Sequence, residues 1–330
     1  MLIGFSVGNY KSFKEIATLN LIVESREPLK ISLIFGANNS GKTNLLRAIK
    51  AMSSMVRFGL SCWLPFKKDE DSIGEPSFFE VVFLARSGDR VQYGFKIKRG
   101  YVEGEWLYKY NSSDNTNTRV IVFERDRLGL IEGCQGNLLD TELFLCKMAT
   151  PESDTVREFF DLTYVGLFTN KKDIDEKIIE FVLENPTLSS RLSKLMSAID
   201  LPIPDPALRL PNSRGFDEAF GFLSLLLFVE EKKIKLLAID NFSENLHPLL
   251  ASSLIKIANS LTAELQLIVA THQVRLMDEV PLTATWVVEK DNKQASTLTG
   301  VAEYKIKTGN VSRKYLNGML GGVPLVNIIY

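Results

Sequence analysis

Residues Gly36 to Thr43 read Gly-Ala-Asn-Asn-Ser-Gly-Lys-Thr, and they directly follow the apolar run 31–35, Ile-Ser-Leu-Ile-Phe. This is the pattern of a phosphate-binding P-loop, in which two glycines frame four residues and Lys-Thr follows. Glycines let the backbone turn tightly and aim its N–H groups inward, which makes an anion-binding nest. A strand-like segment before the loop and a helical stripe of apolar residues after it, at 44–50, give the context that the motif requires.

The motif assigns roles to its residues. We expect Lys42 to reach the β- and γ-phosphates of a nucleotide and the Thr43 hydroxyl to ligate Mg²⁺. The positive N-terminal end of the helix that starts near Lys42 adds to the attraction. The motif alone does not separate an ATPase from a GTPase or a kinase. The predicted nucleotide-binding residues of this segment are Gly36, Ala37, Asn38, Asn39, Ser40, Gly41, Lys42, Thr43 and Asn44.

A second motif is the apolar strand 235–239, Lys-Leu-Leu-Ala-Ile, which ends in Asp240. A carboxylate there accepts hydrogen bonds from Mg²⁺-bound water beside Thr43, so we predict that Asp240 and Thr43 form the metal site. The next residue is Asn241, whose amide can orient water but has no accessible base pKa. The nearest acid downstream is Glu244, which three residues of extended chain would displace by up to roughly 10 Å. We therefore do not expect Glu244 to act as a base.

The chain has two histidines, and each lies shortly past a strand-like segment. His272 ends the run 267–272, where an imidazole of tunable charge can contact the γ-phosphate. Asn241 and His272 are therefore the predicted catalytic residues. His247 lies in the stretch Asn-Leu-His-Pro at 245–248, and it either contacts the site or shapes the loop that enters the helix expected at 249–261.

A third element is the tetrapeptide Asn-Ser-Arg-Gly at 212–215, which precedes a strongly apolar helix at 216–231. A serine at a helix start with a nearby glycine can present a hydroxyl and backbone N–H groups to a phosphate. A plain helix cap is the alternative for this tetrapeptide taken alone. Its position between the P-loop and the strand of Asp240 favours Ser213 and Gly215 as further nucleotide-binding residues.

The bulk composition is that of a folded soluble protein. Its 330 residues are 45% hydrophobic, which provides a substantial core and argues against disorder. The net charge of −1 gives no overall nucleic-acid signature. Three widely spaced cysteines without a CxxC pattern argue against disulfides or a zinc site. No signal pattern occurs at the N-terminus and the longest apolar run, near 220–229, is too short to span a bilayer, so we expect a cytoplasmic protein without membrane contact.

The order of predicted elements indicates an α/β fold with a split core. Helices and strands alternate after residue 207, which predicts a parallel sheet flanked by helices. The expected elements there are helix 216–231, strand 234–239, helix 246–261, strand 265–270 and a strand near 284–289. The first part of the chain predicts strands 2–7, 17–23 and 30–35, helix 42–56 and an exposed loop over 62–74. Strands at 78–85, 90–98, 101–109 and 118–124 predict an inserted antiparallel sheet, and residues 137–200 are mostly helical in pattern. We therefore predict a discontinuous core, 1–60 and 207–330, an antiparallel insert, 61–136, and a helical lid, 137–206.

This order of motifs resembles the short ABC-type ATPases of the RecF/SMC/OLD lineage, especially the stand-alone bacterial group with a compact lid. The resemblance spans nearly the whole chain and implies the P-loop NTPase fold of ABC-ATPase type, with a mixed sheet and with ATP and Mg²⁺ as cofactors. Further segments that resemble the family are Asn9 to Phe13, Tyr93 to Phe95, Glu105 to Leu107, Phe123 to Arg125, Tyr315 to Gly318 and Gly321 to Pro324.

The resemblance also implies partners. In such ATPases the element that matches Ser213 and Gly215 binds the nucleotide held by the other subunit, so ATP joins a homodimer, which can extend to a higher oligomer. Family members often accompany a nuclease or toxin effector in phage defence, which implies a sensor or regulatory subunit here. In hydrolysing members a glutamate usually follows the Asp of the second motif and polarises the attacking water, whereas this chain has Asn241. Slow hydrolysis is therefore expected.

Several other functions stay open at this point. A scaffold that binds ATP with little hydrolysis is favoured by Asn241. A GTPase is suggested by Asp-Arg-Leu-Gly at 126–129 and Asn-Lys-Lys-Asp at 170–173, which mimic switch and guanine-reading motifs. A role in DNA repair or nucleic-acid sensing follows from lineage alone, since no basic and aromatic stripe supports it.

Overall fold

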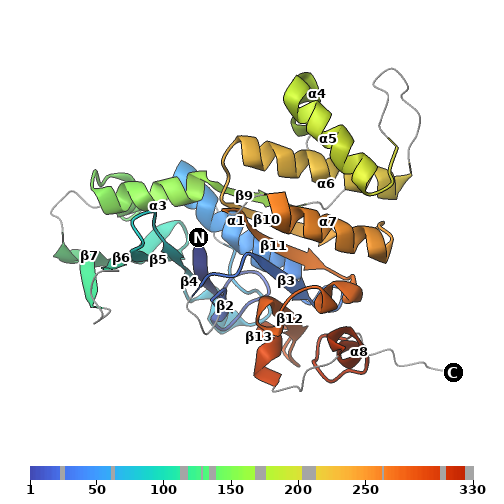
Figure 1. The fold of residues 1–330 in the computed structure, drawn as a ribbon. Coiled ribbons are helices and arrows are strands. Elements are labelled where there is room, and N and C mark those ends of the chain that lie inside the picture. Colours follow the sequence, from blue (N-terminus) through green and yellow to red (C-terminus); the bar gives the residue numbers. More distant parts are fainter. Residues whose placement is uncertain are drawn as a thin grey trace.

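The computed structural model describes residues 1–22, 27–60, 64–111, 118–127, 129–133, 139–167, 176–202, 213–261, 264–304 and 310–323. Two β-sheets lie side by side, and helices cover them (Figure 1). Among the described residues, no helix is both long enough and apolar enough to cross a bilayer. The fold class predicted from the sequence, an α/β fold with a mixed sheet and an added antiparallel sheet, is confirmed.

The core sheet has six strands in the order β13-β12-β3-β11-β10-β9. Its strands are β3 (Ile31–Phe35), β9 (Thr163–Gly166), β10 (Leu236–Phe242), β11 (Gln266–Thr271), β12 (Thr285–Lys290) and β13 (Ser296–Gly300). Strands β9, β10, β11, β3 and β12 run parallel, and β13 pairs antiparallel with β12, so the sheet is mixed. Every residue of β11 is buried, as expected for a central strand that is covered on both faces.

Alternate residues of the core strands supply two hydrophobic cores, one on each face of the sheet. Ile34 and Ala238 pack on the side of α1 (Lys42–Phe58). Leu33 and Ile239 point to the opposite side, toward α6 (Arg214–Glu231) and α7 (Pro248–Leu261). Figure 1 shows α1 on one side of this sheet and α6 and α7 on the other. The period-2 alternation of apolar residues therefore buries both faces of the sheet. Strands β3 and β10 both pair with β11, one on each side of it.

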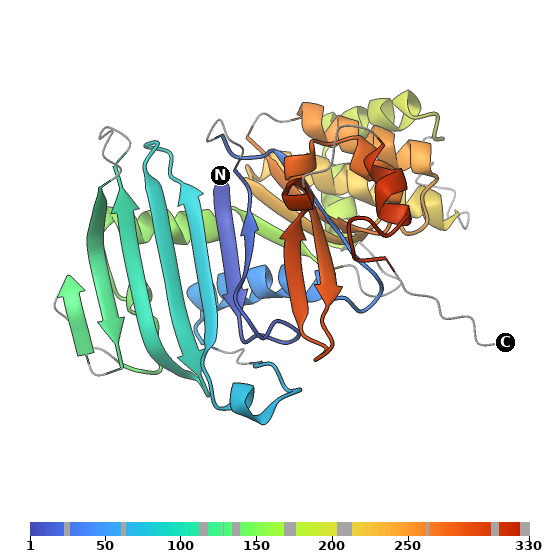
Figure 2. The same ribbon diagram turned by 90° about the horizontal axis from the view of Figure 1, so that it is seen from below.

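The second sheet is antiparallel, with seven strands in the order β2-β1-β4-β5-β6-β7-β8. They are β1 (Leu2–Gly8), β2 (Ala17–Asn20), β4 (Ser77–Leu84), β5 (Arg90–Lys98), β6 (Tyr101–Tyr110), β7 (Arg119–Asp126) and β8 (Gly129–Gly133). Helices α1 and α3 (Pro151–Asp161) lie behind this sheet in Figure 2. The sequence places an inserted sheet after the P-loop helix, but the N-terminal strands β1 and β2 also belong to it. The division of the chain into core, insert and lid stays a prediction.

A buried polar cluster explains three of the sequence segments in this sheet. The Glu105 carboxylate is fully buried and accepts hydrogen bonds from Tyr93 Oη at 3.0 Å and Arg125 Nε at 3.0 Å. It also accepts from the backbone N–H groups of Phe144 at 2.7 Å and Leu145 at 3.0 Å. Four donors thus satisfy one buried charge, as low-dielectric surroundings require. The cluster joins β5, β6 and β7 to the short 3₁₀ helix η1 (Phe144–Cys146).

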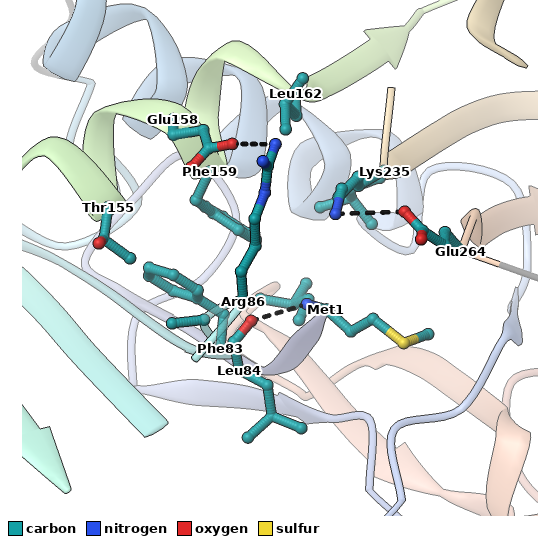
Figure 3. Close-up of a pocket in the computed structure, with 13 residues that line it drawn as sticks. Met1, Phe83, Leu84, Arg86, Thr155, Glu158, Phe159, Leu162, Lys235 and Glu264 are labelled. Atoms are coloured by element: carbon teal, nitrogen blue, oxygen red, sulfur yellow. Dashed lines mark hydrogen bonds and ion pairs between the residues drawn. The ribbon is translucent and has the colours of Figure 1, made fainter. Parts of the chain in front are cut away.

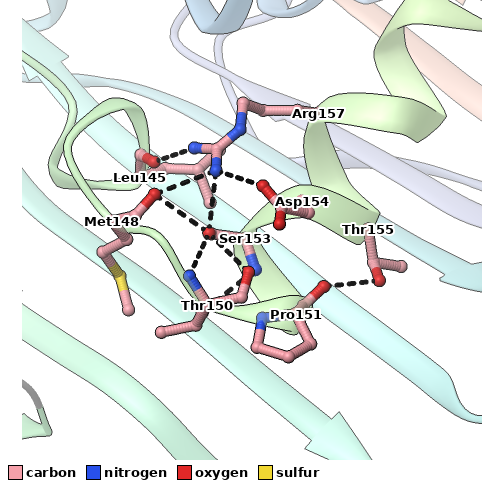
Figure 4. A network of polar contacts seen from close by, with 8 residues as sticks. All are labelled: Leu145, Met148, Thr150, Pro151, Ser153, Asp154, Thr155 and Arg157. Carbon is pink, nitrogen blue, oxygen red and sulfur yellow. Dashed lines mark hydrogen bonds and ion pairs between the residues drawn. The ribbon is translucent and has the colours of Figure 1, made fainter.

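The segment before α3 is fixed by a second polar network (Figure 4). Thr150 and Ser153 form a capping box at the start of α3. The Arg157 guanidinium donates to the carbonyls of Leu145 at 2.6 Å and Met148 at 2.9 Å, and to Ser153 Oγ at 3.0 Å. Because a guanidinium presents several donors in a fixed plane, one side chain closes the whole turn between η1 and α3.

Several elements differ from the sequence-based expectation. Residues 137–200 include α3, α4 (Glu176–Glu184) and α5 (Pro186–Ala198), but also strand β9, which the helical pattern missed. Strands β8 and β13 were not expected either. The stretch predicted as an exposed loop contains the short helix α2 (Glu70–Ile73), and Phe66 within it is buried. The Asn9 amide explains this burial, because it accepts from the Phe66 N–H at 3.1 Å and donates to the Ser72 carbonyl at 2.8 Å.

The two sheets are joined where β1 and β11 begin. Gln266 accepts from the Leu2 N–H at 2.7 Å and donates to the carbonyls of Leu2 and Leu29 at 2.9 and 2.8 Å. A cavity of about 310 Å³ opens beside this contact (Figure 3). Its wall includes the stacked rings of Phe83 and Phe159, and the ion pairs Arg86–Glu158 and Lys235–Glu264 flank it. This cavity lies at the start of β10. The P-loop follows the end of β3, and β3 and β10 run parallel, so the cavity and the P-loop lie at opposite ends of the core strands.

Candidate functional site

The P-loop connects β3 to α1, and its two glycines are required by close contacts. Gly36 has φ +147°, and a Cβ there would lie 2.3 Å from the Val288 carbonyl oxygen. Gly41 has φ +122°, and a Cβ there would lie 2.2 Å from Ser296 Oγ. Any larger residue would therefore meet both strain and a clash. The sequence pattern and the backbone agree at these two positions.

The N-terminus of α1 is open to an anion. Its N-cap is Gly41, which makes no side-chain cap, and its first turn has no acidic residue. The first N–H groups of the helix therefore have no side-chain acceptor. A helix N-terminus of this kind binds phosphate through its N–H groups and its dipole.

Lys42 is buried and points back into the loop. Its Nζ donates to the carbonyls of Gly36 at 2.8 Å and Ala37 at 2.9 Å. Burial lowers the pKa of Lys42 to about 8, and the charge of Asp240 opposes that shift. An ammonium group held by two loop carbonyls at the start of α1 is placed to exchange them for phosphate oxygens.

Side chains from distant parts of the chain support the loop from behind. Asn44 Nδ2 donates to Ser12 Oγ at 2.9 Å, so this predicted nucleotide-binding side chain contacts the N-terminal turn. Ser296 Oγ donates to the Ser40 carbonyl, and the Ser296 N–H donates to the Ser12 carbonyl at 2.6 Å. Sequence reasoning missed Ser12 and Ser296 as supports of the loop. The only signal was the position of Ser12 inside the segment 9–13.

The C-terminal segment also reaches the loop. Tyr315, in α8 (Val311–Leu316), donates its hydroxyl to the Gly322 carbonyl at 2.8 Å. A Cβ on Gly322 would lie 3.4 Å from the Gly36 Cα, and the Gly322 N–H donates to the Glu289 carboxylate. The paired glycines at 321–322, both with positive φ, were the sequence signal for this close approach.

Asp240 lies within β10, in the core of the site. It is fully buried, and among the described residues neither carboxylate oxygen has a hydrogen-bond partner of normal geometry. Burial raises the pKa of Asp240, while the Thr43 hydroxyl, the Asn241 N–H and the charges of Lys42 and Arg47 act in the opposite direction. An unpaired buried carboxylate beside a hydroxyl and an ammonium group is costly unless a cation joins it.

These groups fit Mg²⁺ as the missing cation. Mg²⁺ prefers oxygen ligands, keeps several waters and is usually held by one or two protein oxygens together with substrate phosphates. Thr43 and Asp240 supply a hydroxyl and a carboxylate of this kind. Within the described residues, no group of three or more His, Cys, Asp or Glu side chains forms a metal cage. Thr43 and Asp240 are therefore the residues that would hold a magnesium ion together with phosphate oxygens.

A cavity of about 400 Å³ lies beside the P-loop and the end of β10. The residues that line it are Asn38, Asn241, Phe242, Ser243, Glu244, His272 and Gln273. The structure therefore brings the predicted catalytic residues Asn241 and His272 together with Asn38 of the loop. Partial burial of the imidazole lowers the pKa of His272, and the Lys42 charge acts in the same direction, so both favour the neutral ring.

The structure places two residues that follow Asn241. Glu244 lines the same cavity as Asn241, because the chain between them is not fully extended, and the expectation that it does not act as a base stays a prediction. His247 does not line the cavity; its Nδ1 accepts from the Leu249 N–H at 3.3 Å, which shapes the entry to α7.

The third predicted element lies on α6. Ser213 is the N-cap of this helix, and its Oγ accepts from the Phe216 N–H at 3.3 Å. A Cβ on Gly215 would lie 2.8 Å from the Asn245 carbonyl oxygen, so the helix start packs closely on the turn after Asp240. The hydrogen bonds of the described residues do not join Ser213 to the P-loop of the same chain. Asn212 lies outside the described residues.

The first of the two alternative GTPase motifs does not lie at this site. Asp126 and Gly129 pair directly across the turn between β7 and β8, and the Gly129 N–H donates to Asp126 Oδ1 at 3.1 Å. This tetrapeptide is therefore a hairpin turn of the antiparallel sheet. The stretch 170–173 lies outside the described residues.

Comparison with solved structures places the fold among SMC head domains. The SMC head domain from Thermotoga maritima is 17% identical over 93% of this chain and 99% of that chain, with a TM-score of 0.54. An Smc head bound to the C-terminal domain of ScpA, derived from Pyrococcus furiosus, is 12% identical over 90% and 95% of the two chains, with a TM-score of 0.52. Another SmcHead, bound to the C-winged helix domain of ScpA, matches with a TM-score of 0.53 at 12% identity over 90% and 96%. At these identities the likeness shows the fold alone.

A search of curated proteins gave no significant match. A family model described as "AAA domain, putative AbiEii toxin, Type IV TA system" matches residues 31–134 and 167–278, which is more than half of the chain. These segments contain the P-loop, strands β4 to β8 of the antiparallel sheet, the start of α6, Asp240 and His272. With its P-loop and its SMC-head-like fold, the chain belongs to this family of ABC-type P-loop ATPases.

Proposed function

We propose that this chain binds Mg²⁺-ATP on residues 36–44 with Asp240, dimerises around the bound nucleotide and hydrolyses it slowly. The observation that carries the proposal is the buried carboxylate of Asp240, which has no hydrogen-bond partner of normal geometry among the described residues and lies near Thr43 and Lys42. Mg²⁺-ATP supplies both missing partners, a cation for Asp240 and phosphate oxygens for Lys42.

The arrangement of α6 supports a composite site. Ser213 and Gly215 lie beside the turn 243–245, and the same turn forms a wall of the cavity next to the P-loop. The α6 start and the phosphate site are therefore neighbours around one turn. A second copy related by a two-fold axis would present its Ser213 and Gly215 to this P-loop, and the reverse contact would form at the same time.

The proposed role is that of a cytoplasmic regulatory subunit that controls a protein effector, such as a nuclease or a toxin. Two observations support it. The family description names a toxin of a toxin–antitoxin system, and two solved SMC heads of similar fold are bound to a domain of the partner protein ScpA. A defence or toxin system fits both.

Molecular mass with and without ATP tests the binding and dimerisation steps. We expect ATP with Mg²⁺ to double the mass of the wild-type protein. Lys42→Ala should abolish the increase because the γ-phosphate loses its ammonium partner, and Lys50→Ala, an exposed lysine on the same helix, should not. A Lys42→Ala protein that still dimerises with ATP would contradict the composite site.

A scaffold with little or no hydrolysis is the second candidate, because Asn241 stands where a base is expected. It predicts that Asn241→Glu raises turnover well above that of the wild type. Asn241 has φ +53°, which asparagine tolerates better than glutamate, so this change also costs about 1 kcal/mol of stability. A wild-type enzyme that already turns over quickly, with no gain in the variant, would rule the scaffold out.

The preference for ATP or GTP tests the remaining candidate function, a GTPase. A GTPase is suggested by the stretches 126–129 and 170–173, and Asp126 and Gly129 of the first stretch lie in a hairpin of the other sheet. We therefore expect no preference for GTP in a direct titration, and a clear GTP preference would contradict the proposed function.

A further inference from the structure

We propose that Glu244 is the general base of this ATPase, which removes the proton from the water that attacks the γ-phosphate. The inference rests on the proposed function, because it needs ATP on the P-loop of the same chain. It assigns a catalytic role to a residue three positions beyond the site where a glutamate is expected.

Strand β10 is irregular between Ile239 and Phe242, and the chain turns after Phe242, two residues beyond Asp240. Asn241 has φ +53° and Ser243 has φ +67°, and both values lie in the left-handed region that non-glycine residues rarely adopt. Two such residues within three positions replace the extended path by a tight turn. As a result Glu244 returns to the cavity that Asn38 and His272 also line, and it is the only carboxylate among the described lining residues.

Hydrogen bonds hold this turn in place. Thr271 Oγ1 donates to the Phe242 carbonyl at 2.8 Å and accepts from the Gln273 N–H at 3.0 Å. Ser243 Oγ lies 3.2 Å from Thr271 Oγ1, and it is the donor of this pair because the Thr271 proton is already used. One buried hydroxyl at the end of β11 thus ties both cavity walls together.

A second anchor comes from α6. Glu218 accepts from the Asn245 N–H at 2.9 Å, and the backbone N–H groups of Ser243 and Glu244 also lower its pKa against the effect of burial. The backbone on each side of Glu244 is therefore fixed, which is the usual requirement for a group that must meet a small reactant. Strained backbone that is held from several sides is also a recurrent feature of active sites.

The chemistry of the cavity assigns the roles. The amides of Asn241 and Gln273 can orient a water molecule but cannot take its proton. Burial and the nearby Lys42 charge lower the pKa of His272 and so disfavour protonation of the ring, and its N–H group can donate a hydrogen bond to the phosphate. A carboxylate is the remaining acceptor in the cavity wall.

The step balances with ATP and water as the reactants. The water oxygen attacks the γ-phosphorus while its proton passes to the Glu244 carboxylate. The bond between the γ-phosphorus and the bridging oxygen breaks, and that electron pair leaves with ADP. Glu244 is exposed to solvent, so it can release the proton to bulk water and return to its starting state.

The test compares Glu244→Gln with the wild type in phosphate release, in ATP-dependent mass and in the pH dependence of turnover. We expect turnover to fall by about 100-fold or more, in the range that general-base catalysis contributes, while the mass increase with ATP is kept. The fall of the wild-type rate at acid pH should disappear from the residual activity. Glu231→Gln, an exposed acid at the far end of α6, is the matched control and should not change the rate.

A second variant separates a lost base from a distorted loop. Asn241→Glu lines the same cavity, so it should restore turnover in the Glu244→Gln background. Turnover of Glu244→Gln within twofold of the wild type would overturn the proposal, and so would loss of ATP-dependent dimerisation together with the rate. A wild-type protein that dimerises with ATP but releases no phosphate would also overturn it, yet would leave ATP-dependent dimerisation standing. Absence of any ATP-dependent mass change would instead refute the proposed function.

Discussion

The burial of Lys42 makes a prediction that needs no nucleotide. Its pKa falls from 10.5 to about 8 because folding removes the ammonium group from water. At 1.36 kcal/mol per pKa unit, the charged lysine destabilises the folded state by about 3 kcal/mol below pH 8. Between pH 8 and 10.5 the unfolded chain binds more protons than the folded one, so the free energy of unfolding rises with pH over this window.

The assay is urea unfolding of the wild type and of Lys42→Met at pH 7 and at about pH 9.5, without nucleotide. Methionine keeps the length of the side chain and removes its charge. Linkage with the two pKa values predicts that the wild type gains about 2 kcal/mol relative to Lys42→Met over this pH change. Taking the difference between the proteins cancels the titrating groups that do not interact with Lys42.

Lys50→Met supplies the matched control, since Lys50 is exposed on the same helix. The wild type should gain almost nothing relative to this variant. If the difference between the wild type and Lys42→Met changed by less than about 0.5 kcal/mol, the free protein would keep Lys42 hydrated. That result would refute a pKa of Lys42 lowered by desolvation in the protein without nucleotide.

Three further predictions follow from the same contacts. Bound phosphate should raise the pKa of Lys42, so the affinity for ATP, measured by calorimetry, should fall about tenfold from pH 7 to pH 9. An affinity that does not change with pH would argue against a charged lysine at the phosphate. Gly41→Ala should abolish ATP binding because its Cβ would meet Ser296 Oγ, whereas Gly59→Ala, at another positive φ but with no atom within 4 Å, should still bind ATP. Glu105→Gln should lower the free energy of unfolding, measured by urea unfolding, by about 3–5 kcal/mol, because it leaves the buried Arg125 guanidinium without its carboxylate. Glu142→Gln, in an exposed ion pair, is the control and should lower it by less than about 1 kcal/mol. Equal losses from these two variants would contradict the energetic account of the buried cluster.

Local patterns predicted most of the fold. The apolar alternation of β4 to β7, the buried runs of β3, β10 and β11, and the stripes of α1, α6 and α7 all identify their elements within a few residues. Strand β9 was missed because four residues directly after a helix are too few to show a period. Strand β13, Ser-Thr-Leu-Thr-Gly, is largely polar and pairs at the edge of the core sheet, so its sequence lacks the apolar signal of a central strand.

The site was predictable only where a single segment determines it. The P-loop is identified by its own eight residues, and Asp240 follows from an apolar strand that ends in an acid. The position of Glu244 could not be inferred, because it depends on left-handed backbone at Asn241 and Ser243, and neither residue type requires that conformation. The support of the loop by Ser12 and Ser296 was equally hidden, since it is a tertiary contact between remote segments.

That support has a consequence for the synthesis of the protein. Ser296 and Ser40 are 256 residues apart in the chain, and Gly322 packs against Gly36 over a still longer separation. Contacts of such range form late in folding, because a long loop must close first. A nascent chain that has produced only the P-loop, β3 and α1 therefore lacks the side chains that hold the loop in shape. Capacity to bind the nucleotide should appear on the ribosome only after nearly all of the chain has emerged, so unfinished chains would not compete with complete ones for ATP or for a partner.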